Sequence, residues 1–214
     1  MTPPIKIDFV SDVSCPWCAV GLNALETALR NIGDDIAPEL HFQPFELNPN
    51  MAPEGQDITE HITQKYGSTP EQQEQSRAMI RQRGADVGFD FALGKRNRIY
   101  NTFDAHRLLH WAGLEGRQRE LKHALFEAYF TLGEDPSSHA VLQAAAVKVG
   151  LDAQGAATVL ASDRYAQEVR AAEQFYQQQG INSVPAVIIN DRHLISGGQP
   201  AELFERALRQ IMAG

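Results

Sequence analysis

The sequence predicts an α/β fold in which a strand–helix–strand half and a strand–strand–helix half lie on either side of a long helical segment. Strand-forming residues fill positions 5–10 and 40–47, with an amphipathic helical pattern between them. Helical patterns then continue to about residue 180, after which two short apolar runs and a final helix complete the chain. This order is that of a thioredoxin fold with a large all-helical insertion between its βαβ and ββα halves.

The first half is defined by a change in hydrophobic period. β-Branched residues alternate over residues 5–10, apolar residues recur at helical spacing from Val20 to Ile32, and Gly33 is a suitable helix stop. Residues 40–47 again favour a strand, but Pro44 lacks the amide donor that a central strand needs. We therefore expect this second strand either to break at Pro44 or to lie at an edge of the sheet.

The insertion begins with a loop rich in Pro, Gly and Asn over residues 48–56. Two helix starts follow, at Asp57 with Glu60 and at Thr69-Pro70 with Gln72. The predicted stops are Gly67, Gly84 and Gly113, and further helical patterns cover residues 121–132, 139–149 and 163–179. We assign residues 49–179 to the insertion and residues 1–48 with 180–214 to a thioredoxin-like domain.

The tail returns to sheet-forming residues. Residues 184–189 form an apolar, β-rich run, Asn190-Asp191 is a turn pair, and residues 193–195 predict a short returning strand. Pro200 then marks the start of a last helix with an apolar stripe. The tail therefore supplies the strand pair and the helix that complete the fold.

The composition argues against several classes of function. The 214 residues are enough for one sizeable domain or for one domain with a large insertion, and a composition of 43% hydrophobic and 21% charged residues predicts a folded chain. A formal net charge of −8 argues against nucleic-acid binding, and no basic amphipathic run or long apolar stretch points to a membrane. The N-terminus lacks a basic region followed by an apolar run, so we expect a cytoplasmic protein whose thiols are normally kept reduced.

Only two cysteines occur, and two residues separate them in Cys15-Pro16-Trp17-Cys18. A helix that starts here places Cys15 beside unpaired backbone N–H groups and at the positive end of the helix dipole, which favours a thiolate. Thiolates are the attacking species in disulfide exchange, so Cys15 is the expected nucleophile and Cys18, one turn on, the expected resolving thiol. Pro16 suits the first helical turn, and Trp17 can shield the sulfurs or contact a substrate.

Two other interpretations of the cysteine pair are weaker. A zinc half-site needs two further ligands, but the chain has no other cysteine and its seven histidines show no paired ligand spacing. A purely structural disulfide would close a very short loop in a compartment that reduces it. A redox-active dithiol with no metal and no bound cofactor is therefore the preferred hypothesis.

Val184-Pro185 is the second sequence feature, after the cysteine motif, that defines the predicted site. A proline that opens a strand is tolerated, and the ordinary expectation for such a bond is trans. Because this proline begins the ββα tail downstream of the cysteine motif, we instead expect a cis bond that points the Val184 backbone at the sulfurs. A bound peptide could then pair with Val184 as an added strand.

These segments resemble the DsbA family of thiol–disulfide oxidoreductases, and most closely its cytosolic FrnE-like branch. The resemblance is carried by Asp12–Cys18, by Asn101-Thr102 with Ala105-His106-Arg107, and by Val184-Pro185 through Ile195–Gln199. It implies a thioredoxin core with a helical insertion, protein disulfide exchange or isomerisation through Cys15, and a cis Pro185 that faces this sulfur.

Two alternative functions stay open. The kappa-class glutathione transferases and 2-hydroxychromene-2-carboxylate isomerases share this architecture but typically carry serine in place of the first cysteine, so they resemble the chain less at Cys15. A redox-regulated chaperone or binding module, whose helical insertion holds clients, is the third hypothesis. The expected partners are protein or small-molecule thiols and disulfides, with glutathione as a candidate redox partner and a homodimer through the apolar insertion as a further expectation.

The predicted helix that follows residue 101 supplies further candidates. Asn101 is placed as its N-cap, with Asp104 at the capping-box position. His106 and Arg107 lie off the buried stripe of this helix, on a solvated face or in a cleft lining. The resemblance favours the cleft, so both residues are predicted to contact substrate.

Three other charged residues are weighed for a role near the sulfurs. Asp12 is either a loop-capping residue or a carboxylate close to the thiols, while Arg96 and Arg98 are expected to be surface charges. The Pro-Trp dipeptide between the cysteines does not fix the reduction potential by inspection. The sequence therefore predicts the type of reaction and leaves its direction open.

Overall fold

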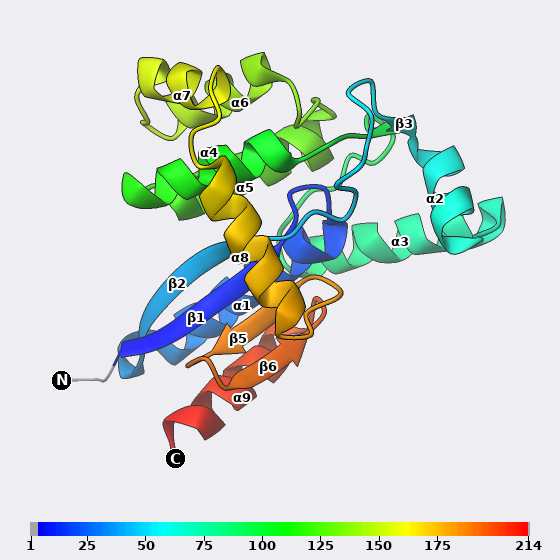
Figure 1. Ribbon diagram of the computed structural model, residues 1–214. Helices are drawn as coiled ribbons and strands as arrows, with labels where there is room; N and C mark the ends of the chain where they lie inside the picture. The colour runs from blue at the N-terminus through cyan, green and yellow to red at the C-terminus, as the bar shows by residue number, and fades with distance from the viewer. Residues whose placement is uncertain (1–3, 214) are drawn as a thin grey trace.

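The computed structural model describes residues 4–213, which form a four-stranded sheet with helices packed on both of its faces (Figure 1). The elements of this core are β1 (Pro4–Ser11), α1 (Pro16–Ile32), η1 (Gly33–Asp35), β2 (Ala37–Pro44), β5 (Ala186–Ile189), β6 (His193–Ser196) and α9 (Ala201–Met212). Between β2 and β5 the chain forms β3 (Gln56–Asp57), α2 (Ile58–Tyr66), α3 (Pro70–Asp86), β4 (Arg98–Ile99), α4 (Phe103–Leu114), α5 (Gln118–Phe126), the π-helical turn η2 (Glu127–Leu132), α6 (His139–Lys148), α7 (Ala153–Leu160) and α8 (Ala166–Gln178). The predicted fold class, a thioredoxin fold with a helical insertion, is confirmed.

The central strand of the sheet is β1. It pairs parallel with β2 and antiparallel with β5, which pairs in turn with β6. Phe9 lies opposite Phe42 in the first pairing and opposite Val187 in the second, and all three side chains are buried. Because β1 and β2 are parallel, the chain must cross over between them, and α1 makes this crossover. The N-terminus of α1 therefore lies at the end of the central strand, and this is where the cysteine motif falls.

The edge strand β2 meets both expectations for Pro44, since the strand lies at an edge and ends at this residue. The outward-facing N–H of Phe42 donates to Oε1 of Gln118 (3.0 Å), and the Phe42 carbonyl accepts from Nε2 of Gln118 (3.1 Å). A side-chain amide of α5 thus pairs with this strand edge and holds α5 against the sheet.

The predicted helix starts of the insertion are confirmed by their caps. The Asp57 carboxylate accepts hydrogen bonds from two N–H groups of the first turn of α2, at 2.9 and 3.0 Å. Thr69 and Gln72 form a reciprocal capping box at the start of α3. Gly67 ends α2 with a φ of 66°, in the left-handed region that favours glycine.

Some details of the insertion differ from the prediction. Gly84 does not end α3, which continues to Asp86; a Cβ at this position would lie 2.3 Å from the Phe91 ring, so close packing requires glycine here. The insertion is not all-helical, since β3 and β4 form a two-residue antiparallel pair. No sequence pattern singled out α7, which begins after Asp152, whose carboxylate accepts from the N–H of Gly155.

The insertion and the thioredoxin-like part share a core. Ile80 of α3 and Phe130 of η2 belong to the same buried cluster as Phe9 of β1 and Leu22 of α1. A second buried cluster joins α4, α5, α6 and α7. Apolar contacts therefore cross the predicted boundary between residues 49–179 and the rest of the chain. The division into an insertion and a thioredoxin-like domain follows the order of the chain, and it remains a prediction.

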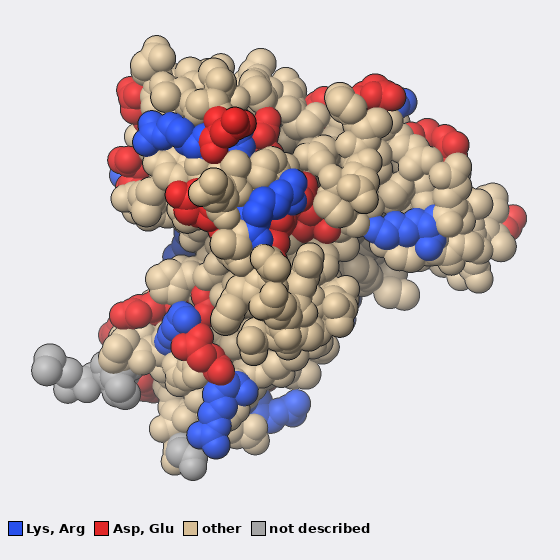
Figure 2. Space-filling model, viewed as in Figure 1, with Lys and Arg blue, Asp and Glu red and all other residues tan. Residues whose placement is uncertain are grey.

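The surface mixes both signs of charge. Acidic and basic side chains are interspersed over the face of the molecule shown in Figure 2. The chain carries 27 Asp and Glu against 19 Lys and Arg. A patch in which positive charges predominate therefore differs in sign from the protein as a whole. Within residues 4–213 no helix is both long and apolar enough to span a lipid bilayer.

Candidate active site

The cysteine motif lies where β1 passes into α1. Cys15 is the N-cap of α1 and has an extended backbone, and Pro16 is the first helical residue. The Cys15 carbonyl accepts hydrogen bonds from the N–H groups of Cys18 (3.1 Å) and Ala19 (3.4 Å). The cysteine motif thus occupies the positive end of the helix dipole, which favours negative charge on sulfur.

The two sulfurs differ in access. Cys15 is 4% exposed and lines a cavity of about 670 Å³, which we call the redox cavity, whereas Cys18 is fully buried and does not line it. The other walls of the redox cavity come from the loop after β2, from α2 and α3, and from residues 182–184. Cys15 is therefore the cysteine that a substrate can reach. A more accessible first cysteine and a buried second one are what a nucleophile and a resolving thiol require.

The peptide bond between Val184 and Pro185 is cis, as the sequence predicts. Its loop brings the carbonyl oxygen of Val184 to 3.7 Å from the sulfur of Cys15, and the thiol donates to it. The Pro185 carbonyl accepts from the N–H of Gly197 (2.8 Å), which ties this loop to the turn before α9. Val184 thus places backbone polar groups directly beside the accessible sulfur.

Two glycines allow this loop to approach α1. A Cβ on Gly21 would lie 3.2 Å from the Pro185 ring, and a Cβ on Gly198 would lie 2.8 Å from the carbonyl oxygen of Trp17. Arg83 of α3 also donates to the Gly198 carbonyl, at 3.2 Å. The first turns of α1 are therefore packed between the Pro185 loop and the insertion, which fixes the position of the cysteine motif.

Asp12 joins the cysteine loop to the loop after β2. Its two carboxylate oxygens accept from the N–H groups of Ser14 (3.0 Å) and Leu47 (2.7 Å), and its carbonyl accepts from the N–H of Cys15 (3.2 Å). Burial opposes ionisation of this side chain, but His106 and the two N–H groups outweigh it, so the pKa of Asp12 lies below its ordinary value. Asp12 is thus both a loop-capping residue and a fixed negative charge near the thiols.

The lowered pKa of Asp12 predicts an acid-sensitive contribution to stability. A carboxyl whose pKa is lower in the folded state stabilises the fold above its unfolded pKa, near 3.8, and loses this contribution as the pH falls through the folded value. Urea unfolding between pH 2 and 5 is therefore expected to show a weaker acid loss in Asp12→Asn than in the wild type. The exposed Asp34→Asn is the matched control, and an acid loss that is the same in all three proteins would contradict this assignment.

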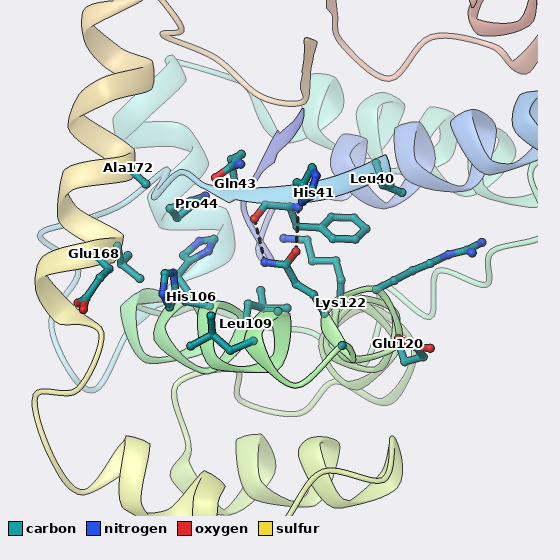
Figure 3. A pocket seen from close by; sticks show the side chains of 18 residues that line it. Leu40, His41, Gln43, Pro44, His106, Leu109, Glu120, Lys122, Glu168 and Ala172 are labelled. Carbon is teal, nitrogen blue, oxygen red and sulfur yellow. Dashed lines mark hydrogen bonds between the residues drawn. The ribbon is translucent and has the colours of Figure 1, made fainter. Parts of the chain in front are cut away.

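Lys122 is a buried charge near the cysteine pair that the sequence does not predict. It is 1% exposed, extends from α5 towards β2 (Figure 3), and its ammonium lies 5.0 Å from the centroid of the Phe126 ring. Burial lowers the pKa of Lys122 to about 8, although Asp12 and, when they are ionised, the two cysteine sulfurs act to raise it. A lysine without a carboxylate partner is rarely buried to this extent, so a role at the cysteines is indicated.

Cys18 holds its proton firmly. Burial is the main reason that the pKa of Cys18 lies well above its ordinary value, and the neighbouring Cys15 raises it further. The positive charge of Lys122 acts in the opposite direction. Cys18 is therefore a thiol at neutral pH, and Lys122 supplies charge that stabilises its thiolate when the proton leaves.

His106 and Arg107 do not reach the redox cavity, which corrects the expectation that they line the substrate cleft. His106 is buried with its Nε2 3.7 Å from the Asp12 carboxylate, and it lines a separate cavity of about 610 Å³ between β2, α4, α5 and α8 (Figure 3). Arg107 is buried too, and it donates to the Asp104 carboxylate and to the carbonyls of Val159 and Arg164. These contacts hold α4 to α7 and to the segment between α7 and α8, so the role of Arg107 is structural.

The start of α4 differs from the predicted capping box. Thr102 occupies the N-cap position, and Asn101 instead accepts a hydrogen bond from the N–H of Phe103 (2.9 Å) one residue further out. Asp104 turns to Arg107 and to His139, 2.7 Å away, rather than to the helix start. A carboxylate that already contacts Arg107 and His139 is not free to close the box.

The basic wall of the redox cavity has no signature in the sequence. Arg96 was expected on the surface, but its guanidinium lies 5.0 Å from the centroids of the Tyr129 and Phe130 rings and lines the cavity together with Lys65 and Arg77. Arg96 belongs to an irregular loop, where no periodicity shows which way a side chain points. Its place in the wall depends on η2, whose Tyr129 and Phe130 rings pack against it.

Comparison with known proteins gives one family over almost the whole chain. The model of a DSBA-like thioredoxin domain matches residues 6–209. The chain is 34% identical to a probable DsbA oxidoreductase from Streptomyces coelicolor, whose structure is solved. The two structures superpose with a TM-score of 0.89 over 98% of this chain and 90% of the other. It is 27% identical over 209 residues to the uncharacterized protein YwbO of Bacillus subtilis (strain 168), over 97% of this chain and 96% of that protein.

A more distant structure shares the fold. The cytosolic disulfide reductase DsbM from Pseudomonas aeruginosa, solved with GSH, is 15% identical, with a TM-score of 0.66 over 98% of this chain and all of the other. The comparisons identify the family and not the FrnE-like branch. The match runs from β1 into α9 and so includes the cysteine motif, the insertion and the cis-proline loop. The chain belongs to the family of oxidoreductases with a DSBA-like thioredoxin domain.

Proposed function

We propose that this protein exchanges disulfides through the Cys15–Cys18 dithiol, with Cys15 as the nucleophile and Cys18 as the resolving thiol. One observation carries this proposal: the Cys15 sulfur lines a cavity at a helix start and lies 3.7 Å from the Val184 carbonyl, while Cys18 is buried behind it. This arrangement gives a substrate disulfide a place beside one sulfur and leaves the second sulfur within the protein.

The reaction balances as a transfer of two electrons. The Cys15 thiolate attacks one sulfur of the substrate, so that a mixed disulfide forms, the substrate S–S bond breaks and the first substrate thiol leaves. Cys18 then attacks Cys15, the internal disulfide forms, and the second substrate thiol leaves. The two protons of the dithiol end on the two substrate sulfurs, and the reverse sequence oxidises a substrate dithiol.

Glutathione as redox partner, a cytoplasmic location, and protein or small-molecule disulfides as substrates are parts of this proposal. The Val184 backbone beside Cys15 supports a peptide substrate that pairs as an added strand. The structure of the cytosolic disulfide reductase DsbM was solved with GSH, which makes glutathione a reasonable first redox partner to test. In such a compartment the dithiol would be the resting form.

A redox titration tests the proposal. The protein is equilibrated with glutathione buffers of increasing oxidised fraction, quenched with acid and alkylated, and its labelled thiols are counted by mass spectrometry. We expect one transition in which Cys15 and Cys18 lose their labels together, and no internal disulfide in Cys15→Ser. Cysteines that stay labelled across the whole range would contradict the dithiol mechanism.

The same titration separates the alternative functions. A kappa-type transferase or isomerase would use glutathione without an internal disulfide, so its activity would survive in Cys18→Ser. A redox-regulated chaperone would form the disulfide but would not turn over a disulfide substrate such as insulin. The cysteine at position 15, where the transferase type carries serine, supports disulfide exchange as the first choice.

A further inference from the structure

The wall of the redox cavity carries positive charge in a protein that is negative overall. Lys65, Arg77 and Arg96 line the cavity with Cys15, and Glu46 is the one carboxylate among its lining residues. The chain as a whole has a formal charge of −8. Figure 2 shows basic side chains on the surface over α2 and α3, the two helices that supply Lys65 and Arg77. The cavity therefore attracts anions although the molecule repels them.

These cations keep their charge available. The ammonium of Lys65 donates to the Leu47 carbonyl (2.7 Å) and the Asn48 side-chain carbonyl (2.8 Å), which are neutral acceptors. Arg77 has a carboxylate, that of Glu74, no nearer than 3.7 Å on the exposed side of α3. Glu46 does not neutralise them, because its carboxylate pairs with Arg170. Lys65 thus has neutral partners, and the carboxylate nearest to Arg77 lies on the exposed side of α3.

Arg96 is the cation of this wall that aromatic rings hold in place. The rings of Tyr129 and Phe130 support its guanidinium, and its Nε is buried without a hydrogen-bond partner among residues 4–213. A buried donor that stays unpaired costs free energy, and a planar guanidinium fixed by stacking is suited to a carboxylate. A ligand carboxylate would meet the part of the Arg96 side chain that lines the cavity.

The cavity also limits the size of the ligand. A volume of about 670 Å³ lies within the range of small-molecule sites, and Trp17, Ile62 and Tyr66 supply apolar wall beside the charges. We propose that the redox cavity takes a small disulfide that carries carboxylate groups, with its sulfur at Cys15 and its carboxylates at Arg96, Arg77 and Lys65. This inference rests on the proposed function and names the substrate class of the same site.

Three small disulfides that differ in charge test this inference. Dithiodipropionate is a dianion, bis(hydroxyethyl) disulfide is neutral and cystamine is a dication. The rate at which the reduced protein reacts with each is divided by the rate of dithiothreitol with the same disulfide, because leaving-group acidity also changes the rate. We expect the dianion to be favoured over the dication by roughly tenfold or more at low salt, with the ratio falling as salt is added.

Variants identify the residues responsible. Arg77→Gln and Lys65→Gln are each expected to reduce the preference several-fold, while Arg96→Lys should keep more of it than Arg96→Gln. Arg81→Gln is the matched control, since it removes the same charge from the exposed side of α3 and Arg81 does not line the redox cavity. A thermal melt of each variant shows whether the change is local.

The outcomes separate this inference from the proposed function. Equal normalised rates for the three disulfides, or a preference that Arg77→Gln and Lys65→Gln leave unchanged, would overturn the anionic site and leave the exchange chemistry standing. No reaction with any of the three would refute the exchange chemistry itself. An acidic peptide disulfide that reacts far faster than the dianion, with the same dependence on Arg77, would overturn the small-molecule class in favour of a peptide.

Discussion

Replacing Cys18 with serine is expected to trap substrates on Cys15 as mixed disulfides. In the wild type the resolving thiol lies within the same helical turn, and well-oriented intramolecular groups react as if present at very high concentration, on the order of 10⁵ M or more. In Cys18→Ser the mixed disulfide must wait for an external thiol at millimolar concentration. We therefore expect its release to slow by at least about a thousandfold.

Non-reducing gels and mass spectrometry after reaction with a disulfide measure this trapping. Cys15→Ser is the control, because it keeps one cysteine but places it in the core, away from the redox cavity. It is expected to accumulate little adduct. Equal trapping by both variants, or full insulin-reducing activity in both, would show that the roles assigned to the two sulfurs are wrong.

Replacing Lys122 with methionine is expected to stabilise the protein and to slow its second step. A pKa lowered from 10.5 to about 8 means that the folded state disfavours the charged lysine, by roughly 3 kcal/mol. Methionine has a similar length and no charge, so it removes this cost at pH 7. It also removes the positive charge that favours the Cys18 thiolate, and the attack of Cys18 on the mixed disulfide should slow.

The pH dependence distinguishes this cause from better packing. Between pH 8 and 10.5 the unfolded lysine is still protonated while the folded one is not, so the stability of the wild type rises with pH across this window. The advantage of Lys122→Met in urea unfolding should therefore shrink from pH 8 upwards and vanish near pH 10.5. An advantage that stays constant with pH would assign it to packing.

A matched lysine on the surface serves as control for this comparison. Lys148 is half exposed and pairs with Glu127, so Lys148→Met removes the same charge without touching the cysteines. Its effect on the free energy of unfolding should stay within about 0.5 kcal/mol at every pH. A destabilised Lys122→Met protein at pH 7 would contradict the burial cost itself.

The parts of the site that sequence predicts are those with a local signature. The Cys15–Cys18 spacing, the strand-to-helix junction and the caps at Asp57 and Thr69 each depend on residues close together in the chain. The cis Pro185 is a partial exception, since its expectation came from its place in the ββα tail and from family resemblance. The reaction type follows from these features, because it needs only the cysteine pair at a helix start.

The residues that sequence could not place are those that depend on packing between distant helices. Gln118 holds α5 against β2, and this places Lys122 close enough to Cys18 to affect its pKa. No pattern within α5 predicts that Lys122 and Cys18 are neighbours. The helical pattern placed Arg107 off the buried face, yet it donates to carbonyl groups at the end of α7 and in the segment that follows. Helical periodicity separates buried from exposed faces against one neighbour, and α4 has neighbours on several sides.

The bond pattern of β2 also closes one edge of the sheet to other chains. Backbone N–H groups alternate in direction along a strand, so Pro38, Leu40, Phe42 and Pro44 share the outward direction of the Phe42 N–H. Two of these residues are prolines without an N–H, and Gln118 already occupies the third, which leaves Leu40 alone with a donor to offer. A second molecule therefore cannot extend the sheet here, and intermolecular strand pairing of the kind that leads to aggregation is blocked on this side.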